Sequence, residues 1–72
     1  MSRNRVPEGL RSLTLLARDV APGDVIEDPD SGAIGEVTAV HLGPRLVIIE
    51  IRDALDWRLE PRSLVRLRWR AW

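Results

Sequence analysis

The 72-residue chain has no cysteine, no phenylalanine and no tyrosine, and it contains three tryptophans. Without cysteine, neither a disulfide framework nor a thiolate metal site can hold the domain together, which is typical of proteins in a reducing compartment. Without phenylalanine or tyrosine, the core must consist of valine, isoleucine and leucine, with tryptophan as the only large aromatic filler. A set of core residues that is mainly aliphatic suits a thin core wrapped by a closed or nearly closed β-sheet.

No apolar run approaches the length needed to cross a bilayer, and the first nine residues are polar and arginine-bearing, unlike a signal peptide. We therefore expect a cytoplasmic protein. The length allows one domain, near the lower limit at which a single apolar core holds a fold unaided.

Lysine is also absent, since all eleven cationic residues are arginine. This bias fits the coding preference of a GC-rich genome, or selection for planar, bidentate contacts to phosphate or carboxylate. The net charge is zero but unevenly distributed. The stretch 19–36 holds six acidic residues and no cation, whereas the stretch 58–72 holds five arginines against Glu60 alone.

Turn chemistry and β-branched residues predict strands through the middle of the chain. Residues 28–32 (DPDSG) form a turn after a short strand that Val25 and Ile26 enter. A long strand follows over 33–42, and neither of its faces is cleanly polar. This predicts a bent strand that serves both halves of a small barrel, with a bulge or coil that changes which face is buried. Residues 43–45 then turn the chain into the strand 46–51, the expected centre of the core.

The segment 10–17 suits either a helical stripe or a strand, and we choose a strand over 13–18 because eight residues are few for a stable helix. A short strand is expected at 57–59. From Val65 onward the chain alternates strictly, with one apolar face and one face of arginines.

The segment PGDVI (22–26), Gly32, the segment GEVTAV (35–40), Val47 and Ile49 resemble the opening of SH3-like small barrels of the KOW and Tudor-like type. The ending WRLEPRSLVRL (57–67) is similar to the last two strands of such barrels, which a proline-led 3₁₀ turn separates. The resemblance implies an all-β, SH3-like five-stranded small barrel over 13–67, with a 3₁₀ turn before the last strand. A flexible N-terminal arm (1–12) and a basic, aromatic C-terminal extension (68–72) would flank it.

Barrels of this type bind nucleic acid or protein. Polyproline recognition would need clustered tyrosines, which this chain lacks, and a Tudor-type aromatic cage would need several convergent rings. His41 has no second histidine or cysteine to complete a metal site, and the Asp28-x-Asp30-x-Gly32 pattern lacks the remaining calcium ligands. No nucleophile elbow or phosphate-binding glycine loop occurs. We expect no enzyme activity, cofactor or metal.

The predicted contact surface is the arginine and tryptophan set near the C-terminus, where guanidinium groups bind phosphate and an exposed indole stacks on a base. Its members are Arg62, Arg66, Arg68, Arg70, Trp57, Trp69 and Trp72. The first hypothesis is a nucleic-acid-associated adaptor. The alternative is a protein-interaction or self-associating module that docks its C-terminal strand on a partner's edge. A third interpretation requires no binding partner, because the arginines can form ion pairs with the acidic stretch 19–36 of the same chain.

Overall fold

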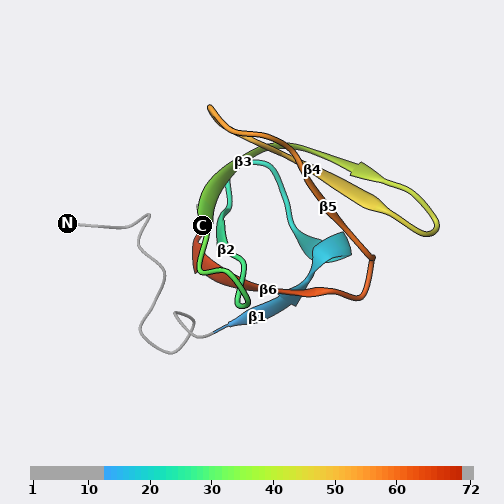
Figure 1. The fold of residues 1–72 in the computed structure, drawn as a ribbon, viewed down its shortest axis with the longest axis horizontal. Helices are drawn as coiled ribbons and strands as arrows, with labels where there is room; N and C mark the ends of the chain where they lie inside the picture. Colours follow the sequence, from blue (N-terminus) through green and yellow to red (C-terminus); the bar gives the residue numbers. More distant parts are fainter. Residues whose placement is uncertain (1–12, 71–72) are drawn as a thin grey trace.

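The computed structural model describes residues 13–70 and is all-β, as predicted. Six strands form one antiparallel sheet in the order β1-β6-β2-β3-β4-β5. They are β1 (Thr14–Leu16), β2 (Val25–Glu27), β3 (Ile34–Leu42), β4 (Val47–Ile51), β5 (Trp57–Leu59) and β6 (Leu64–Trp69). A 3₁₀ turn, η2 (Ala17–Asp19), follows β1. The sheet curls around the core, and the tip of the β3–β4 hairpin projects to one side (Figure 1).

Strand β3 serves both halves of the sheet. Its first residues pair with β2, Ile34 lying opposite Glu27, and its later residues pair with β4, up to Leu42 opposite Val47. The register shifts between Val37 and Ala39, which changes the side chains that face inward. The prediction of one long strand that pairs on both sides, with an irregularity in its middle, is confirmed.

The core lies inside this curl and is aliphatic, as predicted. Strand β4 buries every second residue, and β6 buries Val65 and Leu67 while its alternate residues face outward. The buried set is Ala17, Val20, Ile26, Val37, Val47, Ile49, Ile51, Val65 and Leu67. Alternation of period two places one face of each strand against this core.

The structure corrects several details of the predicted barrel. The sheet has six strands, whereas the resemblance implied five, and the strand predicted over 13–18 is present as Thr14–Leu16 beside β6. That strand ends at Leu16, short of the predicted residue 18, because η2 follows immediately. The 3₁₀ turn therefore lies after β1, whereas residues 60–63 form a simple turn closed by Ser63 N–H donating to the Glu60 carbonyl at 2.9 Å.

Strands β1 and β5 are the two ends of the sheet and do not pair with each other, so the sheet does not close into a barrel through strand pairing. Arg68 and Trp69, which were assigned to a C-terminal extension, lie within β6. The predicted arm 1–12 and the last two residues lie outside the described part of the chain. Within residues 13–70, no helix is long and apolar enough to cross a membrane.

Candidate functional site

The structure places three of the four predicted arginines against carboxylates of the acidic stretch. Arg68 Nη1 donates a hydrogen bond to Glu27 Oε1 at 2.8 Å. Arg66 Nη1 lies 3.9 Å from the other oxygen of Glu27, close enough for an ion pair. Strand pairing explains this contact, because β2 and β6 are neighbours and set Glu27 directly opposite Arg66.

Arg70 makes the most enclosed of these ion pairs. Its Nε and Nη2 donate to the two oxygens of Asp24, each at 2.8 Å, in the bidentate geometry that suits guanidinium and carboxylate. Asp24 is 1% exposed and is the only buried charged residue within residues 13–70. The hydrogen bond that Arg70 donates to Asp24 raises the pKa of Arg70 above its ordinary value, against the opposing effect of burial. Arg66, Arg68 and Arg70 therefore pair with the acidic stretch of the same chain, as the third interpretation of the sequence expected.

The tryptophans do not form an exposed stacking surface in the described residues. Trp57 is half-buried and packs against the core from β5, and Trp69 is half-buried at the end of β6. Trp72 lies outside the described residues. Strand β6 is also an interior strand of the sheet, because β1 pairs with its residues 64–66 and β2 pairs with its residues 66, 67 and 69.

The acidic turn and His41 have structural roles. Asp28 accepts hydrogen bonds from the Asp30 N–H and the Ser31 hydroxyl, which organises the turn that the DPDSG segment predicted. His41 Nε2 is in hydrogen-bond contact with a carboxylate oxygen of Glu50 on the neighbouring strand. Within residues 13–70, no group of three or more histidine, cysteine or acidic residues is placed to hold a metal ion.

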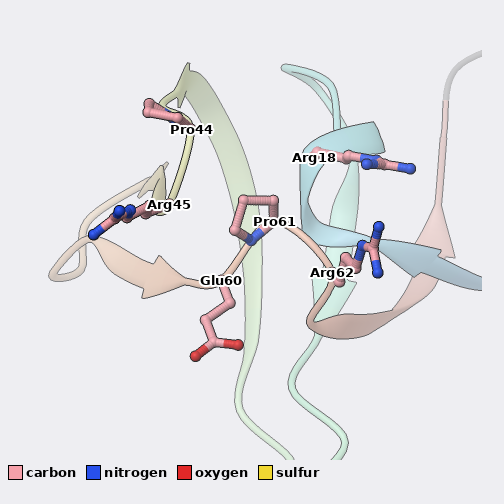
Figure 2. A pocket seen from close by; sticks show the side chains of 6 residues that line it. All are labelled: Arg18, Pro44, Arg45, Glu60, Pro61 and Arg62. Carbon is pink, nitrogen blue, oxygen red and sulfur yellow. The ribbon is translucent and has the colours of Figure 1, made fainter.

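Arg62, the fourth predicted arginine, lines an open hollow of about 550 Å³ at one end of the molecule. Arg18, Pro44, Arg45, Glu60, Pro61 and Arg62 form its walls. Figure 2 shows Arg18 and Arg62 on one side of Pro61, and Pro44 and Arg45 on the other. The Glu60 side chain points away from Arg18 and Arg62 in the same view (Figure 2). The hollow lies between three segments that are far apart in the sequence, namely η2, the β3–β4 turn and the turn 60–63.

Backbone hydrogen bonds hold these turns in place. The Ala17 N–H donates to the Ser63 carbonyl at 2.7 Å, and the Arg18 N–H donates to the Pro61 carbonyl at 3.3 Å. These two bonds bring η2, and with it Arg18, against the turn that carries Arg62. Burial of Ala17 in the core adds to this attachment.

The two turns that supply the other arginines share a Pro-Arg sequence, Pro44-Arg45 and Pro61-Arg62. Proline presets the backbone of the first central residue of each turn. Gly43 opens the β3–β4 turn and donates to the Leu46 carbonyl at 2.9 Å. A Cβ on Gly43 would lie only 2.8 Å from that same oxygen, so the turn requires glycine there.

The hollow carries surplus positive charge. Three guanidinium groups line it against the single carboxylate of Glu60, a balance of three positive charges to one negative. Within the described part of the chain, Arg18, Arg45 and Arg62 make no ion pair, and all three side chains are exposed. Arg18 and Arg45 were not among the predicted contact residues. The repeated Pro-Arg dipeptide was a signal for Arg45, whereas no local pattern marks Arg18.

Comparisons with known proteins find no family model that matches the chain. No curated protein and no solved structure matches it either. The resemblance to KOW and Tudor-like barrels therefore stays a prediction from the sequence motifs.

Proposed function

We propose that this protein is a non-catalytic binding module that holds the phosphate backbone of a nucleic acid in the hollow between Arg18, Arg45 and Arg62. The observation that carries the proposal is that three arginines, which make no ion pair within residues 13–70, line one hollow from three separate turns, with Arg18 and Arg62 on one side of Pro61 and Arg45 on the other (Figure 2). Like charges repel one another, so an anion in the hollow would lower the electrostatic energy of this arrangement. Guanidinium groups donate to phosphate oxygens in a planar, bidentate geometry.

The rigidity of the hollow supports binding. Both Pro-Arg turns have a proline that restricts the backbone, and two backbone hydrogen bonds fasten η2 to the turn 60–63. A site that is already arranged loses less conformational entropy when it binds. The hollow is also open to solvent, which suits an extended polymer better than a small enclosed ligand.

We further propose that the sheet is an SH3-like small barrel, in which β2 to β6 supply the five strands of the fold and β1, which lies within the predicted range 13–67, is an additional strand. Four consecutive strands, β2 to β5, are neighbours in the sheet, and β6 returns to pair with β2. The bend in β3 joins the two halves. Small barrels of the KOW type, which the motifs resemble, bind nucleic acid, and this agrees with the proposed partner.

Fluorescence anisotropy with labelled mixed-sequence single-stranded RNA and DNA, measured across a salt series, tests the binding. Each phosphate contact contributes about 0.7 to the slope of log affinity against log salt for single strands. We expect Arg62→Ala to lower that slope by about 0.7, and the triple change of Arg18, Arg45 and Arg62 to Ala to lose most of the affinity.

Arg58→Ala is the matched control. Arg58 is exposed on β5, makes no ion pair with the residues described, and carries the same charge outside the hollow. If Arg58→Ala and Arg62→Ala weaken binding equally, the hollow is not the site. No binding to either nucleic acid, together with a mass that rises with protein concentration in sedimentation, would favour the protein-interaction alternative.

A further inference from the structure

The outward face of β6 carries Arg66 and Arg68, which follow Arg62 of the hollow by four and six residues in the sequence. Both side chains are about half exposed, at 48% and 50%, and they alternate with the buried Val65 and Leu67. Side chains two residues apart on one strand face stand about 6.6 Å from each other. Strand β6 begins two residues after Arg62, so one short segment carries a wall of the hollow and then this pair of arginines.

A single carboxylate serves both arginines. Glu27 is 15% exposed and lies between them, hydrogen-bonded to Arg68 and 3.9 Å from Arg66. A guanidinium group has five N–H donors, and one hydrogen bond to Glu27 leaves most donors of Arg68 available. Two positive charges against one negative charge leave a local surplus, so an anion can still bind on the solvent side.

We infer that Arg66 and Arg68 form a second phosphate contact for the same nucleic acid strand, and that Glu27 acts as an internal competitor that weakens it. This inference rests on the proposed function. A phosphate at these arginines would lie close to the negative charge of the Glu27 carboxylate, which repels it. Removing that charge should therefore strengthen binding and add to its salt dependence.

The test is Glu27→Gln in the full chain, with the anisotropy assay on labelled single-stranded RNA and DNA. We expect binding about tenfold tighter at low salt, because a repulsion near the phosphate is removed, and a salt slope steeper by about 0.7 for each contact strengthened. The matched control is Glu36→Gln, which changes the net charge equally but removes the partner of Arg52 elsewhere on the surface. Adding Arg66→Ala and Arg68→Ala to Glu27→Gln should abolish the gain.

The outcomes separate this inference from the proposed function. If the parent protein binds in an Arg62-dependent way and Glu27→Gln gains no more than Glu36→Gln, the competitor role is wrong and the hollow stands. If neither the parent nor Glu27→Gln binds, both proposals fail. Should Glu27→Gln not fold, Arg66→Ala with Arg68→Ala in the parent chain decides, because unchanged affinity and salt slope would overturn the second contact.

Discussion

The ion pair between Asp24 and Arg70 should contribute more to stability than any other charged contact described here. Asp24 is almost fully buried, and the Arg70 side chain retains 27% of its exposure. The Asp24 carboxylate also accepts the Ala21 N–H at 2.9 Å, so it stabilises the turn that leads into β2 as well. Because β6 ends beside this turn, the ion pair links the residue before β2 to the residue after β6.

Asp24→Asn removes the charge and keeps the shape. Breaking a buried ion pair by removing one partner costs about 3–5 kcal/mol, and partial hydration of Arg70 reduces this to about 2–3 kcal/mol. For a domain of this size, 1 kcal/mol shifts the melting temperature by about 4–8 °C, so we expect a decrease of roughly 10–20 °C. Circular dichroism and tryptophan fluorescence, which reports on Trp69 near this pair, measure the transition.

The controls identify the cause of the loss. Glu36→Gln removes an exposed ion pair with Arg52 and should change the free energy of unfolding by about 0.5 kcal/mol or less. Adding Arg70→Met to Asp24→Asn should recover part of the loss, since no buried charge is then left unpaired. If Asp24→Asn costs no more than Glu36→Gln, the buried pair does not hold the fold as we infer. Because the pKa of Arg70 is raised, its charge persists through neutral and alkaline pH and is lost only as the pH rises through that higher value.

Two packing predictions can be measured by urea denaturation. Gly35→Ala should destabilise the protein by about 1–3 kcal/mol, because the new Cβ would lie 2.5 Å from Ile51 Cγ2, and an unchanged midpoint would contradict that close approach. Ile49→Ala should cost about 2–5 kcal/mol, because Ile49 is fully buried in β4. Ile34→Ala, at a side chain 56% exposed, should change stability by about 0.5 kcal/mol or less, and equal losses at both positions would refute the assigned core.

The strands could be predicted because their signals are local. The β-branched run 46–51 and the alternation from Val65 onward identify strands and their buried faces without knowledge of any partner strand. The turn at Asp28 could be predicted for the same reason, because Asp28 accepts a hydrogen bond from the N–H of Asp30, only two residues along the chain. The position of the 3₁₀ turn was predicted wrongly, because the hydrogen bonds from η2 to the turn 60–63 join residues more than forty positions apart.

The candidate site could be predicted only in part. Arg62 was identified from the density of arginines near the C-terminus, but Arg18 and Arg45 are isolated cations in the sequence. Their grouping depends on which turns meet at the end of the curled sheet, and Figure 2 shows that meeting. No local pattern of charge contains this information, apart from the repeated Pro-Arg dipeptide.

The amino-acid sequence by itself determined an all-β chain, an aliphatic core, and an acidic stretch followed by a basic one. The tertiary structure alone decided which arginines are paired. Strand order and register set Glu27 opposite Arg66, and the end of β6 lies beside the turn before β2, which brings Arg70 to Asp24. Arg62 instead lines a hollow with Arg18 and Arg45 and makes no ion pair within residues 13–70. The physical reason is that burial follows the local side-chain period of a strand, whereas ion pairing depends on distances between segments that only the folded sheet brings together.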